Sequence, residues 1–158
     1  QMCIRDRCEI ANDNANGQVI VSGDTEAINH LKEILNKSKK KNIMLPVSAP
    51  FHCSLMKSAA EKMKDKIKPI NFTDPVINVI SNVTAEPEKN PEKIKNLLVE
   101  QIYTKVRWRE SIINMSNNGI REFIEIGPGK VLSGLVKRII KDAKANSINS
   151  IEDTKSLK

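Results

Sequence analysis

The chain has 158 residues, of which 39% are hydrophobic and 28% charged, so one ordinary globular domain is expected rather than a disordered chain. No apolar run approaches the roughly 18 residues that cross a bilayer, and the first residues lack the apolar core of a secretory signal, which predicts a cytoplasmic protein without a membrane partner. The net charge of +7 is spread along the chain and accompanied by only 3% aromatic residues, so no nucleic-acid partner is expected.

The first 47 residues contain the pattern of a small α+β unit. Residues 1–7 show no periodicity, and we expect them to be a non-native or misread end. Residues 8–47 predict a strand at 8–12, a β-branched strand at 18–22 after a turn rich in Asn and Gly, a helix begun by Asp24, and a strand at 43–47. This strand–strand–helix–strand unit lacks partners on its N-terminal side and is therefore incomplete.

Residues 48–142 alternate helix and strand patterns. We expect helices over about 51–68, from Pro91, over 108–118 with Gly119 closing the helix, and over 130–141, and strands at 76–80 and 122–126. This order predicts an α/β layer architecture with parallel strands. Apolar side chains at helical spacing are expected to be buried: Leu55, Met56, Ala59, Ala60, Met63 and Ile67 in the first helix, and Val131, Leu132, Leu135, Val136, Ile139 and Ile140 in the last. Residues 143–158 predict a polar, frayed tail.

The chain has few side chains suited to catalysis. His30 lies in the middle of a helix among surface residues, which indicates a solvated side chain, whereas His52 follows a strand and a proline turn and could project into a cleft. Three cysteines without CxxC spacing predict neither a disulfide framework nor a metal site. Cys53 could be proposed as a nucleophile, but adjacent helical residues point about 100° apart, so His52 is badly placed to activate it.

Five stretches of sequence are shared with one enzyme family. LPVSAPFHCSLM at residues 45–56 resembles the histidine motif of malonyl-CoA:acyl-carrier-protein transacylases. In the same order, NANGQVIVSG at 14–23, ISNVTA at 80–85 and QIYTKVRW at 101–108 resemble further family segments, with Lys105 in place of the usual proline. EIGPGKVLSGL at 125–135 matches the family pattern E-I-G-P-G-K-V-L-x-G-L. The resemblance covers about residues 8 to 142.

The resemblance implies a fold and a mechanism. It implies the C-terminal part of an α/β-hydrolase-like parallel-sheet core over residues 48–142 and a partial ferredoxin-like subdomain over 8–47. A serine in a G-H-S-x-G turn attacks malonyl-CoA, and the resulting acyl-serine passes its malonyl group to the phosphopantetheine thiol of acyl carrier protein. His52 matches the general base, and Gln101 matches the residue whose backbone carbonyl orients it. Asn14 borders the site, and Phe51 resembles the malonyl-selective pattern.

The same resemblance implies what the chain lacks. No G-H-S-x-G occurs in the sequence, so no nucleophile is expected within it, and the first strands of the fold are missing as well. A C-terminal fragment, inactive by itself and cut from a monomeric parent, is the expectation, with no bound cofactor or metal. Two alternatives stay open: a polyketide-synthase acyltransferase domain, or a non-catalytic basic module that binds acyl carrier protein or nucleic acid. Lys137, Arg138, Lys141 and Lys144 could dock an acidic carrier or simply complement the helix dipole.

Overall fold

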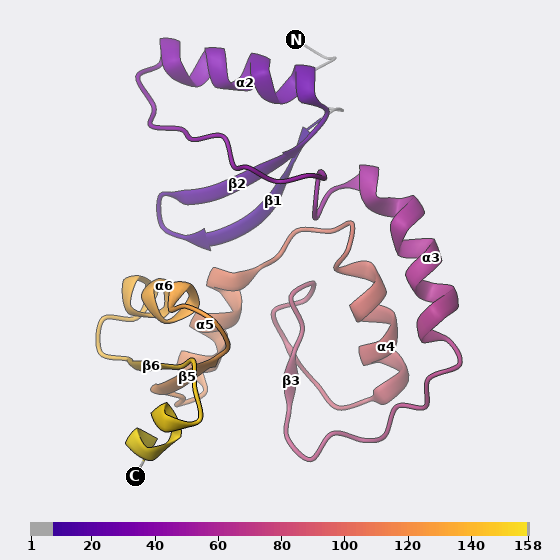
Figure 1. Ribbon diagram of the computed structural model, residues 1–158, viewed down its shortest axis with the longest axis vertical. Helices are drawn as coiled ribbons and strands as arrows, with labels where there is room; N and C mark the ends of the chain where they lie inside the picture. Colours follow the sequence, from indigo (N-terminus) through magenta and orange to yellow (C-terminus); the bar gives the residue numbers. More distant parts are fainter. Residues whose placement is uncertain (1–7, 158) are drawn as a thin grey trace.

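The computed structural model describes residues 8–157, and the expectation for residues 1–7 lies outside this range. Strands β1 (Cys8–Ala15) and β2 (Gln18–Gly23) form an antiparallel hairpin, and Gly17, with φ of 75°, takes the left-handed conformation at its turn. Helix α2 (Thr25–Lys37) lies along the hairpin (Figure 1). As predicted, Asp24 is its N-cap, accepting a hydrogen bond of 3.0 Å from the backbone N–H of Glu26.

The predicted strand at residues 43–47 is wrong, because this segment is irregular and exposed. Its apolar residues are largely in solvent, with Ile43 75% and Val47 60% exposed. A strand needs a neighbour for its backbone hydrogen bonds, and no described strand pairs with this segment. The apolar composition of this segment favours a strand, but the segment does not form one in the described chain.

The next layer consists of two helices and a short hairpin. A 3₁₀ turn, η1 (Ser54–Met56), leads into α3 (Lys57–Ile67), which packs against α4 (Pro91–Glu100) (Figure 1). In the sequence between these helices, β3 (Val79–Ile80) pairs with β4 (Pro87–Glu88) in an antiparallel hairpin. Asn90 and Pro91 begin α4 as predicted.

Burial in this layer is smaller than the pattern predicted. In α3, Ala60 and Ile67 are buried, whereas Leu55 just before it and Met63 are about half exposed. The predicted buried strand at 76–80 is reduced to two residues, and Val76 and Ile77 are 95% and 76% exposed. These apolar side chains have no described layer above them to pack against.

The C-terminal part is a small α/β unit with its own core. Helix α5 (Trp108–Asn117) ends at Gly119 with φ of 88°, as predicted, and is followed by β5 (Glu122–Ile126) and α6 (Val131–Ile139). The core joins Ile112 of α5 to Val136 of α6 and to Ala145. Leu135 and Val136 are buried as expected, but Val131 and Leu132 are 70% and 41% exposed, contrary to expectation.

The prediction of a frayed tail after residue 142 is wrong. Residues Lys144–Ile148 form β6, which pairs in parallel with β5 and buries Ala145 and Ile148 (Figure 1). A short 3₁₀ helix, η2 (Glu152–Leu157), follows. Polar Asn146 and Ser147 obscured the strand in the sequence, since a short strand exposed on one side needs few apolar positions.

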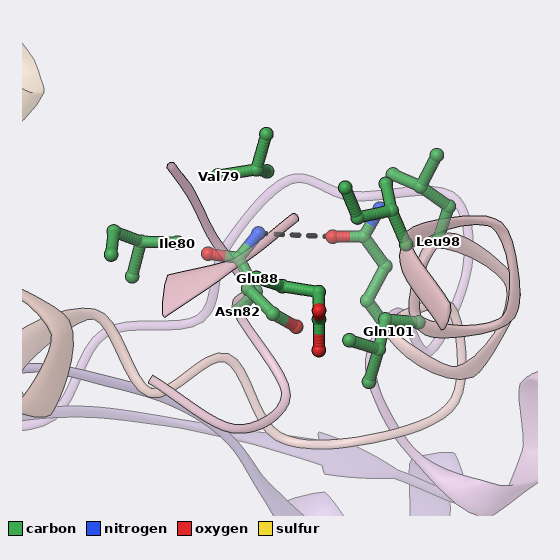
Figure 2. A pocket seen from close by; sticks show the side chains of 9 residues that line it. Val79, Ile80, Asn82, Glu88, Leu98 and Gln101 are labelled. Carbon is green, nitrogen blue, oxygen red and sulfur yellow. Dashed lines mark hydrogen bonds between the residues drawn. The ribbon is translucent and has the colours of Figure 1, made fainter. Parts of the chain in front are cut away.

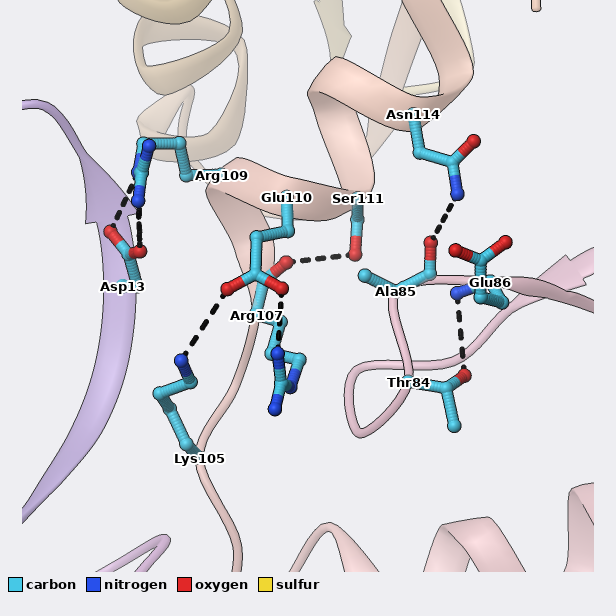
Figure 3. A network of polar contacts seen from close by, with 10 residues as sticks. All are labelled: Asp13, Thr84, Ala85, Glu86, Lys105, Arg107, Arg109, Glu110, Ser111 and Asn114. Atoms are coloured by element: carbon cyan, nitrogen blue, oxygen red, sulfur yellow. Dashed lines mark hydrogen bonds and ion pairs between the residues drawn. The ribbon is translucent and has the colours of Figure 1, made fainter.

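Polar contacts join the N-terminal hairpin to α5. The backbone N–H of Asp13 donates to the carbonyl of Val106 at 3.0 Å, and the N–H of Val106 donates to Ala11 at 2.8 Å. The Arg109 guanidinium meets the Asp13 carboxylate through two nitrogens, with Nη2 2.7 Å from Oδ2 (Figure 3). Its hydrogen bonds hold the pKa of Asp13 below its ordinary value. The described chain is thus a mixed α/β structure, as predicted, and each of its helices falls short of the length and apolar content that crossing a bilayer requires.

Candidate functional site

His52 lies where the N-terminal unit meets the end of α4. The ring atom Nδ1 is 2.7 Å from the backbone carbonyl oxygen of Gln101, and the backbone N–H of His52 donates to the carbonyl of Ile102 at 3.2 Å. The side chain is half-buried. The structure therefore brings together the two residues, 49 positions apart, that the resemblance had paired.

Both contacts follow from the way α4 ends. Gln101 is the C-cap of α4, and the last carbonyls of a helix have no partner within the helix. The ring of His52 contacts the carbonyl of Gln101, and its backbone N–H donates to that of Ile102, the residue after the C-cap.

The backbone of His52 is held in an unusual conformation to make both bonds. Its φ is 60°, in the left-handed region that residues other than glycine rarely adopt. Such a conformation costs free energy and persists when the surrounding contacts demand it, and it is concentrated at functional sites. Lys39 and Ala85 also have positive φ values, of 53° and 61°, so the conformation of His52 is consistent with a functional role but does not single it out.

The contact with Gln101 determines which ring nitrogen can act as a base. A backbone carbonyl accepts hydrogen bonds and cannot donate, so Nδ1 must carry the proton that it shares with Gln101. In the neutral ring this leaves Nε2 without a proton and able to take one from a substrate or nucleophile. In a Ser-His-Asp triad a carboxylate makes the corresponding contact with the imidazole.

A further residue, which the sequence reasoning did not single out as part of the site, contacts Gln101 from the other side. Asn82 follows β3 and donates from Nδ2 to the side-chain Oε1 of Gln101 at 3.0 Å (Figure 2). Both residues line a cavity of about 140 Å³ together with the apolar side chains of Ile80, Leu97 and Leu98. Asn82 lies within residues 80–85, a stretch that the family resemblance covers, so the sequence did mark this region. No rule of spacing, however, connects Asn82 with Gln101.

The segment just after His52 is anchored to β1. The carboxylate of Glu9 accepts from the backbone N–H of Ser54 at 3.0 Å and also from the Ser54 hydroxyl. Cys53 is 1% exposed, and its Sγ lies 3.1 Å from the carbonyl of Pro50. Within residues 8–157 no hydrogen bond joins Cys53 to His52, so the geometry offers no activation of this thiol.

The other predicted site residues are placed less directly. Asn14 is half-buried on β1, where the register with β2 shifts between Asp13 and Ala15. Phe51 directly precedes His52 and is 46% exposed. Of the described hydrogen bonds, none joins Asn14 to His52, and the roles of Asn14 and Phe51 stay predictions.

Two further groups of residues bear on what this part of the chain could bind. Among residues 8–157, no group of three or more His, Cys, Asp or Glu side chains is arranged to hold a metal ion. Lys137 and Arg138 lie exposed in the last turn of α6, and the Arg138 guanidinium donates to the side-chain oxygen of Gln18 on β2. Arg138 therefore links α6 to the hairpin while contributing positive charge to the surface.

Comparison with known proteins shows similarity over nearly the whole chain. No protein-family model matches it. A curated relative, the malonyl CoA-acyl carrier protein transacylase of Bacillus subtilis, is 41% identical over 145 residues, which are 91% of this chain and 46% of the relative. The chain therefore spans about half the length of the curated relatives it matches.

Solved structures agree with this similarity. The crystal structure of an acyl-carrier-protein S-malonyltransferase from Bartonella henselae has a TM-score of 0.90 and 44% identity, covering 95% of this chain and 48% of that one. A malonyl-transacylase in complex with its type II polyketide acyl-carrier protein has a TM-score of 0.89 and 34% identity, covering 96% of this chain and 50% of that one. Sequence and fold thus point to the same group of proteins.

Proposed function

We propose that this chain, which belongs to the malonyl CoA-acyl carrier protein transacylase family, supplies the histidine side of a malonyl-transfer site. The chain spans about half the length of its relatives in that family. The proposed reaction moves malonyl from malonyl-CoA to the phosphopantetheine thiol of acyl carrier protein. The observation that carries the proposal is the 2.7 Å contact between Nδ1 of His52 and the carbonyl of Gln101, which leaves Nε2 as the base.

His52 acts twice in this reaction. Nε2 takes the proton of a serine hydroxyl as the serine oxygen attacks the thioester carbon, and it returns that proton to the coenzyme A sulfur as the C–S bond breaks. In the second half, Nε2 takes the proton of the phosphopantetheine thiol, whose sulfur attacks the acyl-serine, and the serine recovers its proton. The serine is that of the family's G-H-S-x-G turn, which the sequence of this chain does not contain.

Finer features of the fold and site belong to the same proposal. We assign residues 8–47 to a partial ferredoxin-like subdomain and the segment from residue 48 through β6 to the C-terminal part of an α/β-hydrolase-like sheet. The parallel pairing of β5 and β6 supports the second assignment. Asn14 would border the acyl group, and Phe51, which directly precedes His52, would favour malonyl over a branched acyl group, as its resemblance to the malonyl-selective pattern implies.

The proposed partner is acyl carrier protein, and the substrate is malonyl-CoA, with no resident cofactor or metal in the chemistry. The exposed Lys137 and Arg138 of α6 supply positive charge for an acidic carrier. A similar solved structure holds a malonyl-transacylase in complex with its carrier protein, which supports this partner. The buried, free thiol of Cys53 fits a reaction in the cytoplasm.

The test is a chimera in which this chain replaces the matched segment of the Bacillus subtilis relative. Radiolabelled malonyl-CoA and acyl carrier protein are mixed with the chimera and, separately, with this chain alone. We expect malonyl-carrier product from the chimera and none above background from the chain. A folded chimera that transfers no malonyl group, while the unmodified relative does so, would overturn the proposal.

A further inference from the structure

We propose that Asn82 is a positioning residue for His52, acting through Gln101. The inference rests on the proposed function, in which His52 is the base, and it adds a residue that touches neither substrate nor the reacting atoms. Two contacts meet at Gln101: Asn82 Nδ2 donates to its side-chain Oε1 at 3.0 Å, and its backbone carbonyl oxygen lies 2.7 Å from His52 Nδ1.

Gln101 needs an external anchor because it lies at a helix end. The ends of helices fray, and beyond Gln101 the chain continues through turns whose backbone bonds to Val99 and Glu100 are both 3.2 Å long. The N–H of Gln101 keeps a helical bond to the carbonyl of Leu97 at 3.0 Å, but the Gln101 carbonyl that orients His52 has no partner within the helix. Any loosening there would turn the carbonyl away from Nδ1.

Asn82 is well placed to prevent this loosening. Its side chain holds Gln101, while its backbone carbonyl accepts from the N–H of Arg107 at 2.9 Å, so one residue holds both ends of the 101–107 turn. Asn82 itself lies in a turn that is closed by a hydrogen bond of 2.8 Å from the N–H of Ala85 to the carbonyl of Ser81. The side chain of Asn114 on α5 anchors the far end of that turn, donating to the carbonyl of Ala85 at 3.0 Å (Figure 3).

The chemical consequence concerns the tautomer of His52. A well-aligned Gln101 carbonyl stabilises the proton on Nδ1 and leaves Nε2 free. If the Asn82 amide is removed, the carbonyl moves more freely, and a larger fraction of neutral His52 carries its proton on Nε2, where it cannot act as a base. We expect the ratio of the Nδ1–H to the Nε2–H tautomer to fall roughly fivefold, the effect of losing about one ordinary hydrogen bond.

The test reads this ratio directly, by long-range ¹H–¹⁵N correlation spectroscopy of the ¹⁵N-labelled full chain. The chain contains two histidines, so the exposed His30 serves as an internal reference. Asn82→Ala should lower the tautomer ratio of His52, and Gln101→Ala, which keeps the backbone carbonyl but removes Oε1, should lower it equally. The double variant should shift it no further than either single variant, because both break the same link.

Asn114→Ala is the matched control, since it loosens the same turn but leaves the Asn82–Gln101 hydrogen bond in place, and it should lower the ratio far less than Asn82→Ala does. If Asn82→Ala does not fold by its backbone amide spectrum, Gln101→Ala carries the test. An unchanged ratio in folded Asn82→Ala or Gln101→Ala, or an equal fall in Asn114→Ala, would overturn the positioning role. The spectrum needs no turnover, so an inactive chimera would remove the proposed function without affecting this result.

Discussion

The positive φ of His52 predicts an unusual response to glycine at that position. His52→Ala and His52→Gly both remove the ring and its bond to Gln101, so they differ only in how the backbone tolerates a φ of 60°. An L-residue in the left-handed region costs roughly 1–2 kcal/mol, whereas glycine adopts it freely. Glycine loses part of this advantage, about 0.4–1 kcal/mol, through its more flexible unfolded state.

The net expectation is that His52→Gly is more stable than His52→Ala by about 1 kcal/mol. The exposed Lys62 in the regular helix α3 supplies the matched pair. There Lys62→Gly should be less stable than Lys62→Ala by a similar amount, about 1 kcal/mol, because glycine is a poor helix former. The order of the two substitutions is therefore reversed between the two positions.

Urea unfolding followed by fluorescence of Trp108, the single tryptophan, measures all four variants. Trp108 begins α5 and packs against the core of Ile112, Val136 and Ala145, so its emission reports on unfolding of that core. If His52→Ala were as stable as His52→Gly while the Lys62 pair behaved normally, the strain assigned to His52 would not exist. The argument that contacts with α4 force this backbone into place would then fail.

Three further predictions concern the surrounding framework. Asp13→Asn should lower the urea midpoint at pH 7. Because Arg109 holds the pKa of Asp13 below its ordinary 3.8, the stability that the ion pair contributes is complete above pH 3.8 and is lost as the pH falls through the lower folded-state pKa. An equal effect of the substitution at every pH would refute the ion pair. Ile112→Ala should cost about 2–5 kcal/mol in unfolding free energy, whereas the neighbouring, more exposed Ile113→Ala should cost less than about 1 kcal/mol; equal losses would contradict the packing described. Glu125 accepts hydrogen bonds from the first N–H groups of α6, and these bonds lower its pKa. Glu125→Gln should therefore speed amide exchange at the start of α6 at neutral pH, and the difference from the unmodified chain should vanish in acid. Unchanged exchange would argue against this cap.

Local chemistry made several elements predictable from sequence. Asp24 and Asn90 cap their helices and Gly119 closes α5, because side-chain caps and left-handed glycines act over three or four residues. The strand predicted at 43–47 failed for the opposite reason, since pairing depends on a neighbour that lies elsewhere. Strand β6 was missed because α6 separates it in the sequence from its parallel partner, β5, so no local pattern reveals their pairing.

The site divides in the same way. Family resemblance placed Gln101 beside His52 across 49 residues, which no periodicity could have done. The resemblance did not reveal the contribution of Asn82, which depends on where a short turn packs against the end of α4. Nor did it reveal the left-handed backbone of His52, which requires contacts with two carbonyls at once.

The most direct test of the central claim is the rate of acyl-enzyme formation in the chimera with and without His52. Rapid-quench measurement of labelled malonyl-enzyme should show that His52→Ala slows its formation by roughly 10²–10⁴-fold, the usual contribution of a general base. His30→Ala, which alters an exposed residue of α2, should leave the rate unchanged. Acyl-enzyme formation in folded His52→Ala at a rate near that of the unmodified chimera would contradict the account.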